Sequence, residues 1–417
     1  MHSKRPKTFK KRWKQMLIFL SIMGPGIITS NVDNDAGGIT TYSLAGAHFG
    51  YAFLWTLIPI ALALIVVQDM SARMGIVTGK GLSDLIRERF GVKVTFYVLL
   101  ALFLANLGNI VANFAGIASA LEIINIKRQI AVPLAAVLIW LLVVKGNYHS
   151  VEKVFLGASA FYITYIVTGF MVEPEWGKVE GGLLNPRVPF DPVSLSMLLA
   201  LIGTTIAPWM QFYLQSSIVE KNLKIRDYKH SRLDVILGSI IVCVVAFFII
   251  MVCAATLFKN GIRIETAKDA ALALEPLVGQ YSALLFSFGL LNASLFAASI
   301  IPLSTAYVIC EGMGWEEGVN KKFSEAPQFY GLYTLLIAGG AFAILSPRIP
   351  LIPIMYISQV INGILLPLIL IFVLMIINNP KIMGKYTNSK FYNYVTILLI
   401  IIIVISTIAL FYFGLKA

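Results

Sequence analysis

Apolar stretches long enough to cross a lipid bilayer recur along the chain, and they constrain its fold more than any other feature. Residues 364–377 read ILLPLILIFVLMII, and residues 397–413 read ILLIIIIVISTIALFYF. A membrane-spanning helix needs roughly 20 mostly apolar residues. With 58% hydrophobic and 13% charged residues in 417, and a mean hydropathy of +0.82, the sequence predicts an all-α polytopic membrane protein.

Eleven membrane spans are predicted from these stretches. They cover residues 16–46, 51–71, 94–121, 130–145, 152–172, 194–219, 234–257, 281–309, 328–345, 351–377 and 391–414. The loops between them are too short for separate domains, so residues 1–417 are expected to form one transmembrane domain. A basic start runs into apolar residues without a convincing cleavage site, so no cleaved signal peptide is expected.

The net charge of +12 is concentrated in alternate loops. Seven of the first fourteen residues are basic, whereas the loop at 173–180 is acidic. The other basic segments are 73–93, 145–153, 221–232, 321–322 and 381–390. This asymmetry follows the positive-inside rule and predicts a plasma-membrane protein with a cytoplasmic N-terminus and an external C-terminus. It argues against a nucleic-acid partner.

Cysteine and histidine do not indicate a resident metal or cofactor. The three cysteines lie in apolar stretches without a CxxC pair, as Cys243, Cys253 and Cys310. They are interpreted as small core residues rather than disulfides or thiolate ligands. The four histidines fall at the terminus, at span ends or in loops, as His2, His48, His149 and His230. A haem, an imidazole-rich zinc site or a histidine proton relay is therefore not expected.

Two spans carry polar and helix-breaking residues. The first contains SNVDNDAGGITT (30–41), and the sixth contains LALIGTTIAPWMQFYLQSS (199–217), in which Pro208 lacks a helical N–H. They head two groups of five spans, 16–172 and 194–377, and 391–414 is an extra helix. Because each group has an odd number of spans, the two groups enter the membrane from opposite sides. This is the inverted-repeat pattern of secondary transporters. An ordinary kink in each helix is the alternative.

Unwound helix ends leave carbonyl groups without helical partners. Together with Asp33 and Asp35, such carbonyls would form an oxygen-rich cavity suited to a hard cation such as Mg²⁺, Ca²⁺ or Mn²⁺. The third span offers Asn106, Asn109 and Asn113 rather than carboxylates. These asparagines either join helices by hydrogen bonds or line a wet path, and they cannot carry a proton charge near neutral pH.

Several segments resemble the Nramp (natural resistance-associated macrophage protein) family of divalent metal transporters. GPGIITSNVDNDAGGITTYSLAGAHFGY resembles that family's first span, and QDMSARMGIVTGKGLSDLIRERFG (68–91) resembles its second span and following loop. GTTIAPW (203–209), ALALEPLVG (271–279) and ISQVINGILLP (357–367) also match in place. The resemblance covers residues 15–377. It implies a LeuT-like 5+5 inverted repeat with helices 1 and 6 broken, and import of a divalent metal.

The departures from the family pattern bear on the transported ion. Against the family's residues, the first span has Ala36 for proline and Gly38 for the metal-binding asparagine. The sixth span has Ala207 for the metal-binding methionine, and Trp209 and Leu214 for histidines. Acidic residues that the family uses for proton transport align with Asn106, Asn113 and Gly116. The pattern resembles the Nramp-related magnesium transporter branch, which also carries Mn²⁺ and is thought to be uncoupled from protons.

The candidate metal-site residues follow from the breaks and from the resemblance. They are Asp35, Ala207, Thr204, Val32, Gln359, Asp33 and Gly38, with Asn31, Asn34, Thr205 and Trp209 as weaker candidates. Val32, Thr204 and Ala207 are expected to offer backbone carbonyls. Each assignment has a structural alternative: a helix cap for Asp35, an interhelical hydrogen bond for Gln359, an outer vestibule for Asp33, and packing or gating for Trp209. Asp69 and Arg73 are interpreted as a loop-anchoring ion pair.

The predicted function is import of Mg²⁺, and of Mn²⁺, by alternating access without proton coupling, in a protein that functions as a monomer. The metal is substrate, and no cofactor is expected. One alternative is a proton-coupled Mn²⁺/Fe²⁺ importer of Nramp type. A second is an amino-acid or amine transporter on the same fold. A membrane sensor or enzyme is less favoured, because neither a signalling domain nor a nucleophile–base pair is visible.

Overall fold

The computed structural model describes residue 29, residues 32–144, residue 157, and residues 159–186, 189–318 and 321–415. Within these ranges the chain is helical and has no β-strand. The first half contains α3 (Ala36–Phe49), α4 (Leu57–Thr78), α5 (Leu82–Ile123), α6 (Arg128–Val144), α8 (Tyr162–Met171) and α9 (Trp176–Leu184). The second half contains α10 (Pro192–Thr205), α11 (Pro208–Glu220), α12 (Tyr228–Cys253), α13 (Ala267–Ala271), α14 (Glu275–Val278), α15 (Ser282–Met313), α16 (Pro327–Ile344), α17 (Leu351–Ile377), α18 (Pro380–Met383) and α19 (Lys390–Gly414).

The helices match the predicted spans in order along the described ranges. Eight are long and apolar enough to cross a membrane, and two shorter apolar helices cover Arg128–Val144 and Ser159–Met171. α3 supplies the described part of the first span. The beginning of that span, residues 16–28, and the beginning of the fifth span, residues 152–156, lie outside the described residues. The all-α polytopic fold class is confirmed.

The third helix begins earlier than predicted. α5 starts at Leu82 and is interrupted at Gly91, which has φ 81° and ψ 167°. Glycine adopts such a positive φ without steric cost, so the chain can turn there between two helical segments. Charged residues such as Asp84 and Arg87 lower the hydropathy of the first segment. Hydropathy alone therefore detected only the second segment.

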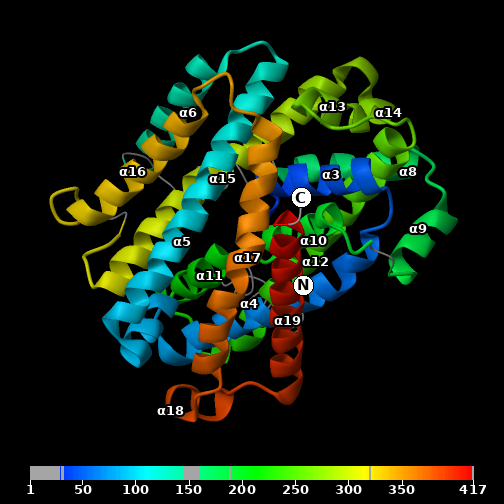
Figure 1. Cartoon of the computed structure of the whole chain (residues 1–417). Coiled ribbons are helices and arrows are strands. Elements are labelled where there is room, and N and C mark those ends of the chain that lie inside the picture. Colours follow the sequence, from blue (N-terminus) through cyan, green and yellow to red (C-terminus); the bar gives the residue numbers. More distant parts are fainter. Residues whose placement is uncertain are drawn as a thin grey trace, which may run out of the picture.

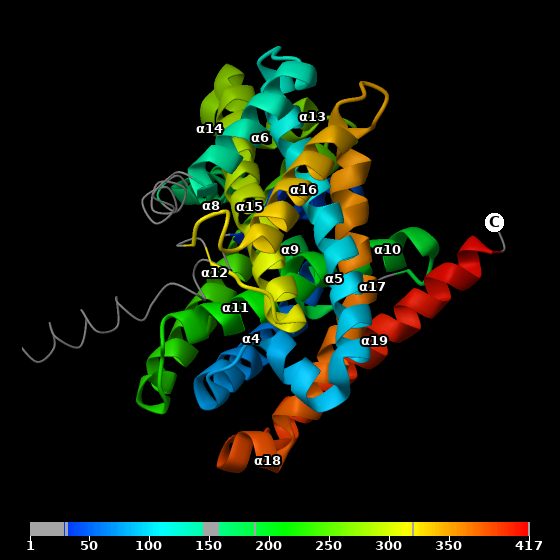
Figure 2. The same ribbon diagram turned by 90° about the vertical axis from the view of Figure 1, so that its left-hand side faces the viewer.

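The interior is built around three long helices. α5 packs against α15 and α17, and these helices run side by side in both views (Figures 1 and 2). α3 contacts α10, α12 and α17, and α10 in turn packs on α17. This arrangement brings the start of α3 and the junction of α10 with α11 together inside the molecule.

Asp69 and Arg73 form the predicted loop-anchoring ion pair. Nη2 of Arg73 lies 3.8 Å from Oδ2 of Asp69, whose side chain is almost fully buried. Nη1 of Arg73 donates to the carbonyl of Thr387 at 3.4 Å, and Nη2 donates to the side chain of Asn388. Arg232 on α12 also approaches Asp69, at 3.7 Å. The pair therefore holds the loop before α19 against α4 and α12, and the prediction is confirmed.

Candidate functional site

The first break lies immediately before α3. Ala36 begins this helix, and its N–H donates to Oδ1 of Asn113 on α5 at 3.3 Å. In a continuous α-helix that N–H would donate to the carbonyl of Val32, four residues earlier. The carbonyl oxygen of Val32 is therefore released from that helical bond, as expected for a backbone ligand.

Asp35 caps the N-terminus of α3. Its Oδ1 accepts from the N–H of Gly38 at 2.9 Å, and its Oδ2 accepts from Nδ2 of Asn113 at 2.8 Å. The carbonyl of Asn34, which Gly38 would engage in a helix, accepts from the Tyr162 hydroxyl on α8 instead. An ionised carboxylate has about four lone-pair sites. Capping therefore leaves Asp35 with capacity for a cation, and the two roles considered for it are compatible.

Gly38 lies where oxygens from both breaks converge on the backbone. A Cβ at this position would lie 2.6 Å from the carbonyl oxygen of Asp33 and 3.3 Å from Oγ1 of Thr204 on α10. Oγ1 of Thr204 is buried and has no hydrogen-bond partner within the described ranges. The absence of a side chain at residue 38 therefore lets a carbonyl and an unused hydroxyl approach the same point of the backbone.

Asp33 is a buried carboxylate without a counter-charge in this part of the site. The residue is 3% exposed, and neither of its carboxylate oxygens has a hydrogen-bond partner among the residues described. Oδ1 of Asn34 is likewise buried without a partner there. Burying an unpaired charge is costly, and a bound cation would offset that cost.

The second break joins α10 to α11. Pro208 has no N–H, so the carbonyl of Thr204 has no donor four residues later. The carbonyl of Ala207 accepts from the N–H of Met210 at 3.1 Å and from the side-chain amide of Gln211 at 2.8 Å. The Thr204 carbonyl is therefore the less engaged of the two candidate carbonyls in this conformation.

Thr205 and Trp209, the weaker candidates from the sixth span, have structural partners. Oγ1 of Thr205 donates to the carbonyl of Leu201, and the Tyr42 hydroxyl donates to Oγ1 of Thr205, each at 2.8 Å. This second bond ties α3 to α10. Trp209 is buried and lies 5.8 Å from the ring of Tyr213 on the same helix. These contacts agree with the packing interpretation of Trp209.

A chain of amide side chains leads away from Asp35 across α5 and α17. Asn113 also donates to the carbonyl of Asn109 at 2.9 Å. The side chains of Asn109 and Asn362 exchange two hydrogen bonds, at 3.1 and 2.8 Å, and Asn362 donates to Gln359 at 3.0 Å. Gln359 packs on Gly37, where any Cβ would collide with its amide group. The amides thus join helices by hydrogen bonds, one of the two roles considered for the asparagines.

The structure brings together most of the predicted site. Its residues are Val32, Asp33, Asn34, Asp35, Gly38, Thr204, Thr205, Ala207 and, through Gly37, Gln359. Asn31 lies outside the described residues. In the described ranges no three His, Cys, Asp or Glu side chains gather closely enough to hold a metal ion. An ion here would therefore depend on carbonyl, hydroxyl and water oxygens as well as carboxylate.

Three residues of the site were not identified from the sequence: Tyr42, Tyr162 and Asn362. Asn362 lies inside the segment ISQVINGILLP, where its polarity in an apolar span was a usable signal. The two tyrosines had no such signal, because a tyrosine in a membrane span is commonly a packing residue.

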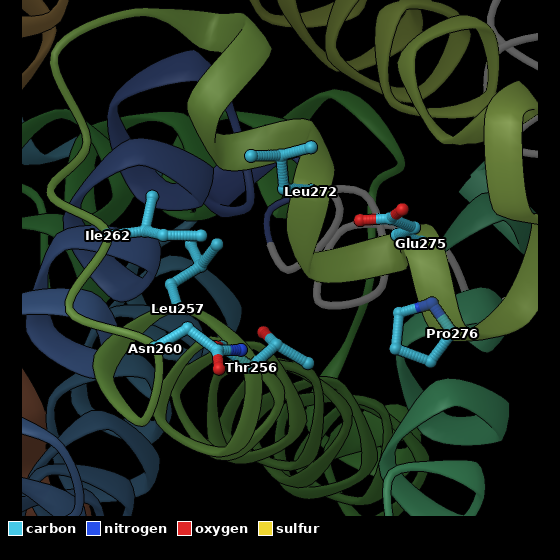
Figure 3. Close-up of a pocket in the computed structure, with 7 residues that line it drawn as sticks. All are labelled: Thr256, Leu257, Asn260, Ile262, Leu272, Glu275 and Pro276. Carbon is cyan, nitrogen blue, oxygen red and sulfur yellow. The ribbon is translucent and has the colours of Figure 1, made fainter.

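A separate pocket of 240 Å³ lies away from the breaks (Figure 3). It is lined by Thr256, Leu257, Asn260, Ile262, Leu272, Glu275 and Pro276. Its walls come from the π-helical turn Ala254–Phe258 and from the segment around α14. Glu275 is its one carboxylate, so the pocket lacks the converging oxygen atoms found at the breaks.

Known proteins resemble this chain in sequence and in fold. The family model described as natural resistance-associated macrophage protein-like matches residues 26–413. A divalent metal cation transporter, MntH, of Caldanaerobacter subterraneus is 27% identical over 411 residues, covering 95% of this chain and 94% of the relative. A crystal structure of the Eremococcus coleocola manganese transporter superposes with a TM-score of 0.78 at 22% identity, covering 97% of this chain and 88% of that one. MhsT in complex with L-phenylalanine superposes with a TM-score of 0.61 at 13% identity, covering 92% and 98%.

The chain has the LeuT-like fold, with two facing broken helices, as predicted. The chain belongs to the natural resistance-associated macrophage protein (Nramp) family, because that family's model covers nearly its whole length. Its curated relatives are metal cation transporters rather than enzymes, and the metal is their substrate.

Proposed function

We propose that this chain is a divalent metal cation transporter that imports Mg²⁺, and also Mn²⁺, by alternating access without cotransport of protons. The observation that carries this proposal is the environment of Asp35. Its carboxylate accepts from the Asn113 amide at 2.8 Å and from the N–H of Gly38, where oxygens of both breaks converge. A hydrogen bond from an amide donor favours the ionised form of a carboxylate, which is the form that binds a cation.

The chemistry of the site favours a hard cation. Its available donors are carboxylate, carbonyl and hydroxyl oxygens, from Asp35, Val32 and Thr204. Ala207 contributes no sulfur at the position where Nramp transporters have methionine. Soft sulfur ligands favour transition metals, whereas Mg²⁺ prefers oxygen and retains several waters. A site whose donors are oxygen atoms therefore suits a partly hydrated Mg²⁺, and Mn²⁺ accepts the same ligands.

The same residues support transport without protons. Asn113 contacts Asp35 directly, and Asn109, Asn362 and Gln359 continue the chain of amides. An amide cannot exchange its charge state near neutral pH. A proton released at Asp35 would therefore find no titratable neighbour along this route.

Voltage would supply the driving force. With the N-terminus in the cytoplasm and the C-terminus outside, the proposed direction is inward. A potential that is negative inside contributes about 2.3 kcal/mol per charge per 100 mV, and double that for a divalent ion. We propose the plasma membrane as the location and the monomer as the functional unit.

The test is uptake into proteoliposomes with an imposed potential and internal dyes for Mg²⁺ and pH. We expect Mg²⁺ uptake without internal acidification, and we expect Asp35→Asn to reduce it by more than about ten-fold. Glu275→Gln, which makes the same change at a distant pocket, should leave uptake intact. Manganese uptake with acidification and no Mg²⁺ flux would support the proton-coupled alternative. Metal-independent uptake of an amino acid or amine would support the alternative of an amino-acid or amine transporter.

A further inference from the structure

The hydroxyl of Tyr162 on α8 bonds the backbone of the first break. Residues 32 and 33 are helical and α3 begins at Ala36, so Asn34 and Asp35 form the break itself. The Tyr162 hydroxyl donates to the carbonyl of Asn34, and the two residues are buried, at 6% and 2% exposed. A side chain from the fifth predicted span is thus attached to the middle of the break in the first.

The neighbours of α8 hold it firmly enough for this hydroxyl to act as a fixed point. Just before α8, the ring of Phe161 lies against Gly289 of α15, where an added Cβ would be 2.1 Å from it. Near the other end of α8, an added Cβ at Gly169 would be 2.6 Å from the ring of Phe248 on α12. Such close packing leaves α8 little room to slide along either neighbour. The position of the Tyr162 hydroxyl is therefore determined by α12 and α15 rather than by α3.

The bond from Tyr162 also bears on which acceptor the N–H of Gly38 uses. In the structure this N–H donates to Oδ1 of Asp35 at 2.9 Å. If α3 were one residue longer, the same N–H would donate to the carbonyl of Asn34, four residues earlier. That carbonyl is held by Tyr162 instead. Asp35 therefore stays outside the helix, with φ −73° and ψ −169°, and its carboxylate accepts from Asn113.

We propose that Tyr162 is a positioning residue for the transported cation, because its hydrogen bond to Asn34 keeps α3 from extending through Asp35. Without the hydroxyl, the carbonyl of Asn34 becomes a buried acceptor without a donor, which is unfavourable until it finds another. The N–H of Gly38 is the donor that an α-helix supplies to it. Asp35 then loses its capping bond, takes up helical backbone angles and carries its carboxylate away from Asn113.

This inference deepens the proposed function and rests on it in one respect, namely that Asp35 binds the metal. Tyr162 acts on the cation through the backbone of Asn34 rather than as a ligand. Loss of its hydroxyl leaves the kinds of donor atom unchanged, so Mg²⁺ and Mn²⁺ should lose affinity by the same factor. Exchange of a ligand atom would instead change the preference between the two ions.

The primary test measures binding without transport. Purified full-length protein is titrated with MnCl₂, free Mn²⁺ is followed by electron paramagnetic resonance, and MgCl₂ is added as competitor. We expect the dissociation constants of both ions to rise by about ten-fold in Tyr162→Phe. Tyr165→Phe is the matched control, because it removes the same atom from a fully buried tyrosine of α8 whose hydroxyl has no hydrogen-bond partner among the described residues. It should bind both ions as the wild type does.

Asp35→Asn separates a failure of this inference from a failure of the proposed function. Binding that is lost in Asp35→Asn but unchanged in Tyr162→Phe would overturn this inference alone. Binding that survives in Asp35→Asn would reject the metal site, and this inference with it. Equal weakening in Tyr162→Phe and Tyr165→Phe would also overturn the inference. Mn²⁺ binding that is weakened in Tyr162→Phe, without competition from Mg²⁺, would leave the inference standing while rejecting Mg²⁺ as substrate.

A second measurement distinguishes positioning from a general effect on folding. Initial cation uptake into proteoliposomes is measured over a range of concentrations at fixed membrane potential. We expect KM to rise by about ten-fold in Tyr162→Phe while kcat stays within about two-fold of the wild type. A merely structural role would reduce the amount of active protein, which lowers the apparent kcat and leaves KM unchanged. That pattern, or a change in the ratio of the KM values for Mg²⁺ and Mn²⁺, would contradict the proposal.

Discussion

The side-chain amide of Asn113 donates to the carboxylate of Asp35 across 2.8 Å, joining α5 to the first break. Replacing Asn113 with aspartate would place two carboxylates at hydrogen-bond distance. Two such groups cannot both ionise freely, so one of them takes up a proton near neutral pH. We expect cation uptake to depend less on pH in the wild type than in the variant. In Asn113→Asp it should rise steeply between about pH 5.5 and pH 8.

The measurement is initial uptake at fixed membrane potential across that pH range. Asn378→Asp is the control, because Asn378 at the end of α17 bonds Asn393 rather than Asp35. A flat profile in Asn113→Asp would contradict the proposed influence of Asn113 on the ionisation of Asp35.

Gly38→Ala should impair transport through a single methyl group. Its Cβ would approach the carbonyl of Asp33 to 2.6 Å, so the unwound backbone must shift. We expect uptake to fall by about ten-fold or more with little loss of folded protein. Gly108→Ala is the matched control. Gly108 lies on α5, where an added Cβ would meet no atom within 4 Å, so this variant should transport normally. Equal cation uptake by both variants would show that the oxygens beside residue 38 do not contribute to transport.

Ala207→Met should change ion preference. A thioether at the second break supplies a soft ligand, which favours Mn²⁺ over Mg²⁺. We expect the ratio of Mn²⁺ to Mg²⁺ uptake to rise by about ten-fold, measured in competition. Proton movement should not accompany this change, because the amides at Asn113 and Asn109 remain. A ratio unchanged by the thioether would indicate that residue 207 does not face the ion.

Breaking the ion pair at the end of α4 should destabilise the protein. Asp69→Ala removes the partner of Arg73 and Arg232 and leaves the less exposed arginine, Arg73, without its carboxylate. Removing one member of a buried pair typically costs about 3 kcal/mol or more. In detergent, the thermal unfolding temperature of Asp69→Ala should be clearly lower than that of the wild type. Lys178→Ala, which breaks an exposed pair with Glu175, should have almost no effect. Similar unfolding temperatures in the two variants would contradict the anchoring role.

Glu317, in the segment after α15, should make stability depend on pH. Burial, and then the charges of Glu311 and Asp84, raise the pKa of Glu317 to about 8, and Glu220 acts in the same direction. Because the pKa is raised in the folded state, the folded protein is more stable when the Glu317 carboxyl is protonated. Its contribution to stability is complete below the usual pKa of about 4.3 and is lost as the pH rises through about 8. Glu317→Gln should therefore flatten the fall in unfolding temperature over that range, whereas the exposed Glu180→Gln should not.

The sequence was sufficient to locate both breaks. Pro208 and the polar run around Asp35 mark them without reference to any other part of the chain. The hydrogen bonds that decide which oxygens at the breaks stay available to a cation were not predictable, because they join residues far apart in the chain. The hydroxyl of Tyr162, 128 residues from Asn34, donates to the Asn34 carbonyl, so which freed carbonyls remain available depends on the packed structure. Gly91 was missed for another reason: its turn lies among charged residues, where hydropathy carries no signal.

The contact between Gly37 and Gln359 affects how easily the site can open. There, α3 and α17 meet through a bare backbone and an amide rather than through interlocking apolar side chains. Apolar surface returned to water costs about 25 cal/mol per Å², but an amide returned to water regains hydrogen bonds. Parting these helices at this level therefore sacrifices little hydrophobic free energy. The contact between α3 and α17 at Gly37 can therefore be hydrated and dehydrated at a small cost in free energy, which favours a site that opens and closes.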